Sequence, residues 1–360
     1  MQLAKPLAPG SIIGILGGGQ LGRMLALAAA RLGFKCHIYA PEADSPAFQV
    51  SHAHTVAAYT DFAALGRFAK AVDVVTYEFE NVPAETATFF EGRVPLSPTA
   101  AALRTAQDRF EEKTYLASLG IPVASFAAVE NEASLEEAIN RIGHPAILKT
   151  RRFGYDGKGQ TKIEANTSAA AAWAEIGKAP AILEGYVNFD TEISVIAARG
   201  LDGATAIYDV PENRHENHIL HTSTVPAAIA SQLADEARAI GGRIISALNY
   251  VGVMGIEMFV GERGLVVNEI APRVHNSGHW TMDACAVSQF EQHIRAICGW
   301  PLGSTSRHSD VVMTNLLGDD AGTWASLAAD PRAIIHLYGK AEARRGRKMG
   351  HVNRLTPRQS

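Results

Sequence analysis

Two apolar segments near residue 260 each carry one glutamate in their middle. Residues 253–260 read VMGIEMFV and residues 265–270 read LVVNEI, which places Glu257 and Glu269 among aliphatic and aromatic neighbours. The glycines between the segments predict a β-hairpin over residues 251–270. An ionised carboxylate left unpaired among such neighbours costs several kcal/mol. The two glutamates therefore have to face a cation, a lysine or solvent.

The register of this hairpin decides whether the two glutamates meet. A loop with an odd number of residues, centred on Arg263, sets Glu257 opposite Glu269 on one face, about 5 Å apart. Two like charges at that distance invite a divalent cation, and oxygen ligands with no cysteine nearby favour Mg²⁺, with Mn²⁺ as the second choice. A slip of one residue turns Glu269 to the other face, and the sequence leaves this register open. A solvated outer face is the alternative for the pair.

A glycine-rich stretch between two predicted strands is the second strong signal. The strands are residues 145–150, which contain Lys149, and residues 161–164. The residues that join them include Gly154, Tyr155, Asp156, Gly157, Lys158, Gly159 and Gln160. They do not form a Walker A loop, because a glycine and not a serine or threonine follows Lys158. Such a loop can fold over a triphosphate and donate backbone N–H groups, with the two lysines supplying positive charge. An ordinary mobile turn is the alternative.

The first hundred residues alternate strand and helix. Strands are predicted over residues 11–16, 35–39 and 72–77, and a helix is predicted over residues 21–32. The intervening GGGQLG at residues 17–22 fits G-x-G-x-x-G, so its amides can face a phosphate at a helix N-terminus. Tight packing of strand against helix is the alternative for this match.

Acidic residues near these strands offer two different sites. A dinucleotide-binding dehydrogenase needs an acidic residue about 20 positions after the glycines, and Glu42 and Asp44 lie in a proline-rich loop there. Glu78 and Glu80 instead follow the strand over residues 72–77 at its carboxyl end, where open α/β sheets place their ligands.

The rest of the chain continues with helices and strands. One charged amphipathic helix is predicted over residues 103–119, stopped by Gly120 and Pro122. The remaining pattern predicts strands over residues 181–184, 192–198 and 204–210, and helices over residues 169–176 and 227–248.

Composition indicates a globular cytoplasmic protein of two or three domains. With 360 residues the chain exceeds a usual single domain, and its 47% hydrophobic and 19% charged residues are typical of globular proteins. No apolar run approaches about 20 residues and the N-terminus lacks a secretory signal, so neither a membrane span nor secretion is expected. A formal charge of −4 argues against nucleic-acid binding. Cys36, Cys285 and Cys298 lack metal-ligand spacing and are expected to be buried.

Further polar groups follow the predicted hairpin. Residues 271–281 read APRVHNSGHWT, and Arg273 with the loop after it can face an anionic substrate. His275 and His279 are four residues apart, but the intervening residues are poor helix formers, so a zinc pair on a helix is not expected. The basic cluster that includes Arg347 and Lys348 is either a solvated face or a site for a monophosphate.

Five stretches together resemble one family, N5-carboxyaminoimidazole ribonucleotide synthetase, an ATP-grasp enzyme of purine biosynthesis. They are GILGGGQLGRM at residues 14–24, TYEFENV at 76–82, LKTRRFGYDGKGQ at 148–160, YVGVMGIEMF with NEIAPRVHNSGHWT at 250–259 and 268–281, and GRKMGHVN at 346–353. They run nearly from end to end. The blocks APRVHNSGHWT and GRKMGH are specific, whereas the glycine loops are shared across the wider superfamily.

The resemblance implies an α/β and α+β fold of three domains. These are a Rossmann-like pre-ATP-grasp domain over residues 1–103, an ATP-grasp domain over residues 104–299 and a small β-rich C-terminal module over residues 300–360. The ATP-grasp domain has a first part, residues 104–187, with the glycine loop, and a second part, residues 188–299, with the metal hairpin. A homodimer is also implied.

The resemblance further implies a reaction. ATP phosphorylates bicarbonate to carboxyphosphate, which carboxylates the exocyclic amine of 5-aminoimidazole ribonucleotide and leaves ADP and phosphate. Carboxyphosphate hydrolyses readily, so a glycine loop that closes over it and excludes water has a clear purpose. Phosphoryl transfer otherwise requires the protein to position the reactants and to neutralise the phosphate charge.

Roles for individual residues follow from the same resemblance. Arg109 and Lys149 contact phosphates under the glycine loop of residues 154–160. The adenine, ribose and nucleotide edge are met by Glu184, Gly185, Tyr186, Val187, Glu192 and His215. Glu257 and Glu269 ligate the metal, and Asn268 or water completes the shell. The residues for aminoimidazole ribonucleotide are Glu78, Tyr155, Arg273, His275, Asn276, Lys340, Arg347 and Lys348. Of these, Glu78, Tyr155, Arg273 and Lys348 are the catalytic candidates, with Glu80 as second choice to Glu78.

Three other functions stay open at this point. A formate-dependent glycinamide ribonucleotide transformylase would keep most of the nucleotide site but has a different loop after the second metal glutamate. An NAD-dependent dehydrogenase would rest on the N-terminal glycine loop alone. A non-catalytic nucleotide sensor would bind ATP without turnover.

Overall fold

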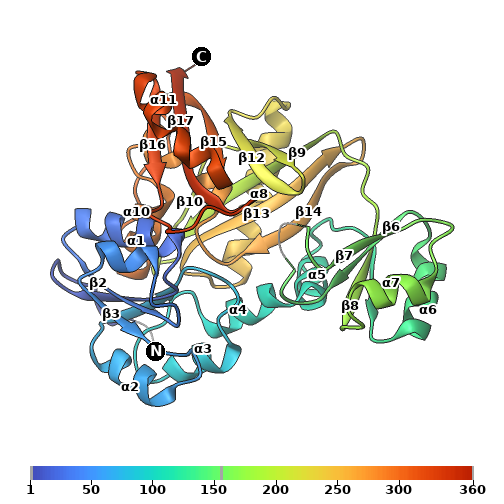
Figure 1. Ribbon diagram of the computed structural model, residues 1–360, viewed down its shortest axis with the longest axis horizontal. Helices are drawn as coiled ribbons and strands as arrows, with labels where there is room; N and C mark the ends of the chain where they lie inside the picture. Colours follow the sequence, from blue (N-terminus) through green and yellow to red (C-terminus); the bar gives the residue numbers. More distant parts are fainter. Residues whose placement is uncertain (1–2, 155–156, 359–360) are drawn as a thin grey trace.

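The computed structural model describes residues 3–154 and 157–358. Its N-terminal part is a four-stranded parallel sheet in the order β3-β2-β1-β4 (Figure 1). The strands are β1 (Ile12–Leu16), β2 (Lys35–Ala40), β3 (Ala53–Val56) and β4 (Val74–Tyr77), and the helices are α1 (Gln20–Arg31), α2 (Phe62–Lys70) and α3 (Ala84–Phe90). The predicted β-α-β start is confirmed, whereas β3 was not predicted because its AHTV sequence is short and half polar. Strand β4 ends directly before Glu78.

The single helix predicted over residues 103–119 is wrong, because two helices meet there. They are α4 (Ala100–Gln107) and α5 (Arg109–Ser118), and Asp108 between them has an extended backbone with φ −119° and ψ 112°. The Asp108 carboxylate accepts hydrogen bonds from the amides of Phe110, at 3.0 Å, and Glu111, at 3.3 Å. An aspartate that caps a helix satisfies amides that would otherwise lack partners. The break is therefore a new helix start.

A small antiparallel sheet carries the glycine loop. Its order is β5-β8-β6-β7, and α6 and α7 pack against it (Figure 1). The bounds are β5 (Phe126–Val129), α6 (Glu132–Ile142), β6 (Ala146–Thr150), β7 (Gln160–Ile163), α7 (Ala169–Glu175) and β8 (Ala181–Gly185). Trp173 and Leu135 from the two helices join Leu148 and Leu183 of the strands in one core cluster. The predicted arrangement of strand, glycine loop and strand is confirmed.

The rest of the chain is built on one large sheet. Its order is β14-β13-β9-β11-β12-β15-β17-β16, and β10 pairs with β9. The strands are β9 (Thr191–Arg199), β10 (Thr205–Ile207), β11 (Glu212–Glu216), β12 (Ile219–Val225), β13 (Gly252–Gly261), β14 (Gly264–Ala271), β15 (Ser309–Leu317), β16 (Ala333–Leu337) and β17 (Lys348–Pro357). Strands β11 and β12 were not predicted because charged and histidine residues interrupt their apolar pattern. The strand predicted over residues 204–210 is shorter than expected.

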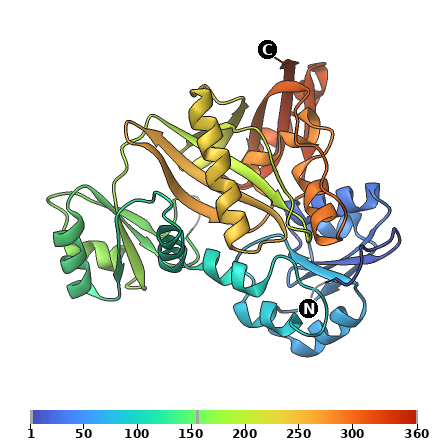
Figure 2. The same cartoon turned by 180° about the vertical axis from the view of Figure 1, so that it is seen from behind.

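Helices cover the two faces of this sheet. They are α8 (Ser231–Ala247), α9 (Thr281–Ala284) and α10 (Gln289–Ile297), and α8 begins four residues later than predicted. Helix α11 (Trp324–Ala329) lies next to β16 and buries none of its residues. Val195 of β9 packs in a cluster with Ile244 of α8, whereas the next residue, Ile196, packs in a cluster with Phe290 of α10. Side chains that alternate along a strand thus serve two cores. Figure 2 shows α8 lying across the sheet, on the side turned away in Figure 1.

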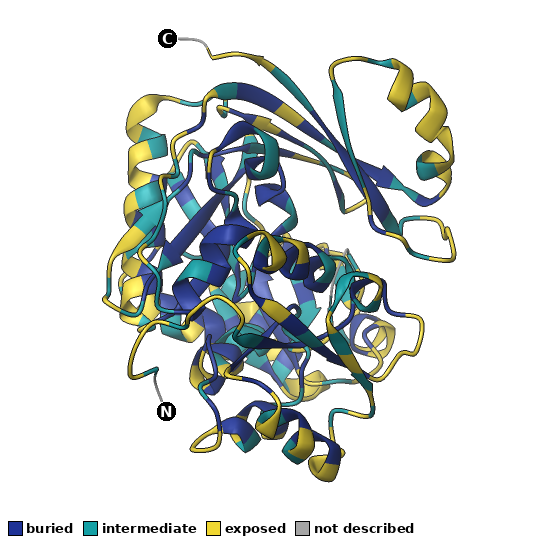
Figure 3. Cartoon of the chain, turned by 90° about the vertical axis from the view of Figure 1, so that its left-hand side faces the viewer, coloured by how far each residue is buried: buried dark blue, intermediate teal, exposed yellow. Residues whose placement is uncertain are grey.

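The C-terminal strands are part of the large sheet. Strand β15 pairs with β12, where Thr222 stands opposite Thr314, and with β17 along its other edge. Figure 3 shows buried residues gathered on the strands, with exposed residues on the outer faces of the helices. The expected burial of the three cysteines is confirmed. Among the described residues, no helix is long and apolar enough to cross a membrane.

His293 of α10 ties the N-terminal sheet to the large sheet. Its Nδ1 accepts a hydrogen bond from the amide of Val253 on β13, at 3.1 Å, so the proton lies on Nε2. That Nε2 lies 2.8 Å from Oγ1 of Thr76 on β4 and donates to it. Both strands carry or lead to a candidate site residue, because Glu78 directly follows β4 and Glu257 lies within β13. One neutral imidazole therefore helps to fix the two strands relative to each other.

Acid should weaken this connection. Burial lowers the pKa of His293 to about 3, whereas an unfolded histidine titrates near ~6.5. Between these values the unfolded chain binds the extra proton, so the free energy of unfolding falls as pH falls, by about 1.4 kcal/mol per pH unit for this group. We expect His293→Gln to show a shallower loss of stability than the wild type between pH 6.5 and pH 5, measured by urea unfolding. The control is His54→Gln, at an exposed histidine. If the free energy of unfolding fell equally with pH in all three proteins, His293 would not be the source of the loss.

Candidate active site

The two hairpin glutamates face each other. Glu257 on β13 pairs with Glu269 on β14, which settles the register that the sequence left open. The odd-numbered loop that was expected to produce this pairing is absent, because Gly261 pairs with Gly264 and leaves a two-residue turn. The register changes between Met258 and Glu257 instead, and Asn268 is the extra residue on β14. A β-bulge of this kind sets two residues of one strand against one of the other.

The two carboxylates differ in their surroundings. Arg109 Nη1 lies 2.8 Å from Glu269 Oε2, and although burial opposes ionisation, this arginine keeps the pKa of Glu269 below its usual value. Glu257 has no arginine partner of this kind; burial, with the charge of Glu269, raises its pKa to about 7. His275 Nε2 lies 3.3 Å from Glu257 Oε1. A second positive charge near the pair would therefore stabilise the ionised form of Glu257 in particular.

Oxygen atoms around the pair suit a hard divalent cation. Asn268 Oδ1 is buried and has no hydrogen-bond partner among the described residues, and it lies in the bulge between the paired positions. Two carboxylates and one amide oxygen are ligands that Mg²⁺ accepts, usually with water and phosphate oxygens completing its shell. In the described part of the chain no group of three or more His, Cys, Asp or Glu residues could hold a metal alone. The site therefore fits a cation shared with a phosphate ligand better than a cation held by protein alone.

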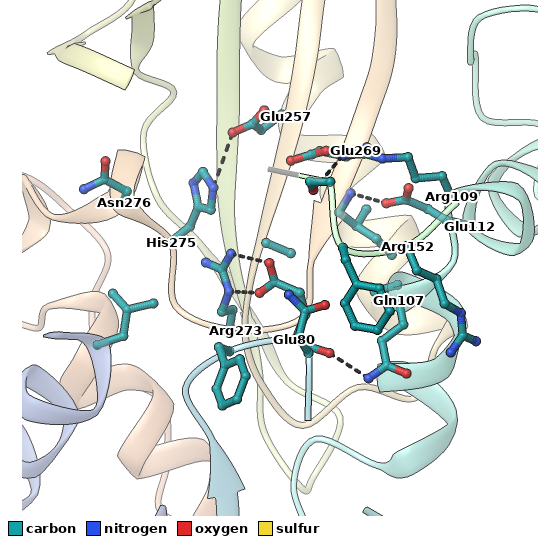
Figure 4. A pocket seen from close by; sticks show the side chains of 18 of the residues that line it. Glu80, Gln107, Arg109, Glu112, Arg152, Glu257, Glu269, Arg273, His275 and Asn276 are labelled. Carbon is teal, nitrogen blue, oxygen red and sulfur yellow. Dashed lines mark hydrogen bonds and ion pairs between the residues drawn. The ribbon is translucent and has the colours of Figure 1, made fainter. Parts of the chain in front are cut away.

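One cavity lies on the side of the glutamate pair that carries residues expected to bind the acceptor, and it is called the acceptor cavity below (Figure 4). Its volume is about 360 Å³. Arg273 makes a two-pronged contact with Glu80, with Nη2 at 3.0 Å from Oε1. Both carboxylate oxygens of Glu80 therefore accept hydrogen bonds from Arg273. Of the residues expected to bind the acceptor, this cavity is lined by Glu78, Arg273, His275, Asn276 and Lys348.

A second cavity is lined by residues expected to bind the nucleotide, and it is called the nucleotide cavity below. Its volume is about 390 Å³. Lys149 Nζ contacts Glu184 Oε2 at 3.0 Å, and Glu192 contacts the Nδ1 of His215 at 2.9 Å. Burial favours neutral His215, but Glu192 overcomes this effect and raises the histidine pKa. The predicted nucleotide residues that line the cavity are Arg109, Lys149, Gly157, Lys158, Gln160, Glu184, Gly185, Tyr186, Val187, Glu192, His215, Asn268 and Glu269.

The two cavities share one wall. Arg109, His215, Glu257 and Glu269 line both of them. A molecule in the second cavity can therefore present its reactive end to a molecule in the first across the glutamate pair. This shared wall is the geometric property that a phosphoryl transfer between two bound substrates requires.

Glu78 occupies the position that the sequence pattern offered to a phosphate. Its carboxylate accepts hydrogen bonds from the amides of Gly19, at 2.5 Å, and Gly22, at 2.7 Å, at the start of α1. A Cβ atom at Gly19 would lie 2.5 Å from Glu78 Oε1. Burial raises the pKa of Glu78, and the two amides offset only part of that rise. The glycine-rich turn of residues 17–22 therefore binds a carboxylate of the chain itself at these amides.

A third cavity, of about 340 Å³, lies beside Glu78 and receives the remaining predicted acceptor residues. It is lined by Gly17, Glu78, Lys340 and Arg347 among others, and it shares Glu78 with the acceptor cavity. Lys340 Nζ donates to the carbonyl of Lys348 at 2.6 Å. Burial, with the nearby charge of Arg347, lowers the pKa of Lys340 to about 8. Seven of the eight predicted acceptor residues thus line two adjoining cavities, and the eighth, Tyr155, lies outside the described residues.

The glycine loop of residues 154–160 only partly meets the prediction that it lines the nucleotide site. Tyr155 and Asp156 lie outside the described residues. Gly154 lines the acceptor cavity, where its carbonyl accepts from Arg109 Nη2 at 3.2 Å. Gly159 lines none of the three cavities and bonds through its carbonyl to the amide of Thr150 at 2.8 Å. Its φ of 69° is a conformation that favours glycine, so this residue shapes the hairpin.

Several residues of the site were not predicted. Phe259 stacks on Phe189 with ring centroids 4.5 Å apart and lines the nucleotide cavity. Phe259 stands two positions after Glu257 and so on the same face of β13, a signal that the period of a strand could have provided. Glu112 lines the acceptor cavity, and Lys113 lies 3.7 Å from Glu184. These two belong to a helix whose charges resembled a solvated face.

Comparison with known proteins agrees with this architecture. Residues 11–107 match the ribonucleotide synthetase preATP-grasp domain, residues 114–290 the ATP-grasp domain and residues 311–360 the phosphoribosylaminoimidazole carboxylase C-terminal domain. The N5-carboxyaminoimidazole ribonucleotide synthase of Brucella melitensis is 55% identical over 355 residues, which are 98% of each chain.

Solved structures agree as well. An ADP complex of an N5-carboxyaminoimidazole ribonucleotide synthetase superposes with a TM-score of 0.95 at 44% identity, covering 98% of this chain and 94% of the other. The Aspergillus clavatus synthase in complex with ADP and 5-aminoimidazole ribonucleotide gives a TM-score of 0.90 at 31% identity, covering 97% and 94%. The predicted pre-ATP-grasp, ATP-grasp and C-terminal parts are thereby confirmed, and the chain belongs to the N5-carboxyaminoimidazole ribonucleotide synthase family of ATP-grasp enzymes.

Proposed function

We propose that the two cavities hold ATP and 5-aminoimidazole ribonucleotide, and that bicarbonate is activated at their shared wall. The enzyme carboxylates 5-aminoimidazole ribonucleotide in an ATP-dependent reaction of purine biosynthesis. The γ-phosphoryl group of ATP passes to a bicarbonate oxygen, giving ADP and carboxyphosphate. The exocyclic amine then forms a bond to the carboxyl carbon, phosphate leaves and the amine loses a proton. The position of Glu257 and Glu269 between the cavities is the observation that supports this assignment of sites.

On the nucleotide side, the residues act by positioning and charge. Glu184 to Val187 meet the adenine, Glu192 and His215 meet the ribose and its neighbouring edge, and Lys149 contacts the phosphates. Glu257, Glu269 and the Asn268 amide would hold Mg²⁺, which would neutralise phosphate charge during transfer. Arg109 already lies against Glu269 and is placed to contact the same phosphates. The charge of ATP thus meets cationic groups around the shared wall.

On the acceptor side, Glu78 is the proton acceptor that we assign to the amine. Its carboxylate is fixed by two backbone amides, and burial raises its pKa, which makes it a stronger base than an ordinary carboxylate. Arg273, held by Glu80, is placed to bind the anionic carboxyphosphate together with Lys348. Lys340 and Arg347 in the adjoining cavity suit the ribonucleotide phosphate. Glu80 is thereby assigned to orienting Arg273.

The test is acceptor-stimulated release of phosphate from ATP. We expect release to require both bicarbonate and 5-aminoimidazole ribonucleotide, with one ADP formed for each carboxylated product. Stimulation by formate and glycinamide ribonucleotide instead would overturn the proposal, and ATP binding without stimulated turnover would favour a nucleotide sensor. The dehydrogenase alternative loses its support, because Glu78 occupies the amides of Gly19 and Gly22.

Several expectations from the sequence stay predictions. They are the homodimer, the cytoplasmic location, the use of bicarbonate and the domain limits at residues 103 and 299. Sedimentation velocity on the purified chain would test the dimer directly.

A further inference from the structure

The bulge at Asn268 determines where both metal-site glutamates point. Met258 pairs with Val267 and Glu257 with Glu269, so Asn268 has no partner of its own on β13. A regular ladder would pair Glu257 with Asn268 instead. Glu269 would then turn to the opposite face of the hairpin, because side chains alternate along a strand. Whatever stabilises the bulge therefore keeps the two carboxylates together.

Helix α5 covers the bulge with a buried lysine. Strand β14 is an edge of the large sheet, and the ammonium of Lys113 donates to the carbonyls of Val267, at 3.2 Å, and Asn268, at 2.6 Å. Carbonyls of consecutive residues in a regular strand point to opposite sides, so one ammonium reaches two of them where a bulge turns them together. Lys113 thus bonds to a conformation that a regular β14 would lack.

Two further residues of the same helix hold the next part of the strand. Glu112 Oε1 accepts a hydrogen bond from the amide of Ile270 at 2.5 Å, and Arg109 pairs with Glu269 at 2.8 Å. Residues at spacings of three and four lie on one face of a helix. Four consecutive residues, 267–270, are therefore held from one side by Arg109, Glu112 and Lys113.

The burial of the Glu112–Lys113 pair makes this contact costly to break. The two residues are only 2% and 1% exposed. A buried polar group that loses its hydrogen-bond partner is destabilising, so neither group tolerates a shift of β14 away from α5. Lys113 also lies 3.7 Å from Glu184, but Lys149 is the nearer partner of that carboxylate at 3.0 Å. The carbonyls of the bulge are thus the hydrogen-bond acceptors of the Lys113 ammonium.

We propose that Glu112 and Lys113 are positioning residues, which hold the β14 bulge and so keep Glu257 and Glu269 in the geometry that binds a divalent cation. The inference rests on the proposed function of the two glutamates as metal ligands. Neither positioning residue needs to touch the cation or either substrate. Their removal should weaken metal binding more than nucleotide binding.

The experiment measures metal and nucleotide binding separately, without turnover. Mn²⁺ binding to the complex with a non-hydrolysable ATP analogue is followed by electron paramagnetic resonance, and binding of the analogue alone is followed by calorimetry in chelator. We expect Lys113→Met, which keeps the length of the side chain but has no donor, to weaken Mn²⁺ binding about 10-fold or more. Binding of the metal-free analogue should change by less than about threefold. Lys113→Gln, which keeps an amide donor, should lose less Mn²⁺ affinity than Lys113→Met.

The control variant is Glu111→Gln. Glu111 directly precedes Glu112 in α5, its side chain is 63% exposed, and it lies 3.8 Å from Arg151. Its variant should bind Mn²⁺ like the wild type. Unchanged Mn²⁺ affinity in Lys113→Met, or an equal loss of metal and metal-free nucleotide affinity, would overturn the proposal. If Lys113→Met does not fold, the same comparison on Lys113→Gln decides. A wild type that binds Mn²⁺ and nucleotide but lacks acceptor-stimulated turnover would instead refute the proposed function alone.

Discussion

Glu269→Gln will lower kcat about a thousandfold, or ~4 kcal/mol of transition-state stabilisation, while the folded structure persists. Glutamine keeps the shape of the side chain but removes the charge that a divalent cation needs. The Arg109 guanidinium, 2.8 Å away, also loses its ionic partner. Glu257→Gln should have an effect of similar size, because the two residues are paired across one bulge. Phosphate release at increasing Mg²⁺ concentration, with circular dichroism as a check of folding, measures both effects.

The matched control lies at the tip of the same hairpin. Glu262 is exposed in the two-residue turn between Gly261 and Gly264, so Glu262→Gln should retain wild-type turnover and metal dependence. Unchanged Mg²⁺ dependence in both Glu257→Gln and Glu269→Gln would show that the metal is held elsewhere. A loss of turnover in the Glu262→Gln control would point to an effect on the hairpin as a whole.

Glu78→Gln should lower kcat/KM for 5-aminoimidazole ribonucleotide by about 100-fold or more. The change removes the carboxylate that we assign as proton acceptor. It also sets an amide N–H₂ against the backbone N–H of Gly19 or Gly22, where two donors cannot bond to each other. The KM for ATP should change little, because Glu78 lines the two acceptor-side cavities and not the nucleotide cavity. Steady-state kinetics with each substrate varied in turn separates the two effects.

Glu91→Gln is the control for this variant, since Glu91 is an exposed residue of the same domain that directly follows α3. Equal losses for ATP and for the acceptor in Glu78→Gln would place Glu78 in a structural role. An unchanged kcat/KM for the acceptor would show that a group other than Glu78 accepts the amine proton.

The sequence predicted those parts of the site that follow from strand periodicity. Two carboxylates within apolar strands have few stable environments, so the pairing of Glu257 with Glu269 could be named as one of two registers before any coordinates were known. Periodicity does not show a bulge, and the same pairing was therefore attributed to a longer turn. Asn268 was expected to complete the metal shell, but not to be the extra residue of a bulge that makes the pairing possible.

The missed features are those in which the chain satisfies its own polar groups. A glycine-rich turn before a helix accepts any anion, and the sequence does not reveal that Glu78, 59 residues after Gly19, supplies it. Asp108 broke a helix that looked continuous because its carboxylate caps the second half. Glu112 and Lys113 resembled surface charges, since helical spacing alone does not tell a solvated face from one that covers a strand edge.

The continuity of the large sheet makes the C-terminal strands inseparable from the catalytic core. Strand β12 would become an exposed edge if the chain ended before β15, because its hydrogen bonds from Thr222 to Val225 run to that strand. Exposed edges are templates for pairing with other chains. The shortened protein would also lack Lys340, Arg347 and Lys348. A gene fragment that encodes only the first 300 residues should therefore yield aggregates, so the acceptor site cannot be isolated from the nucleotide site by cutting the chain there.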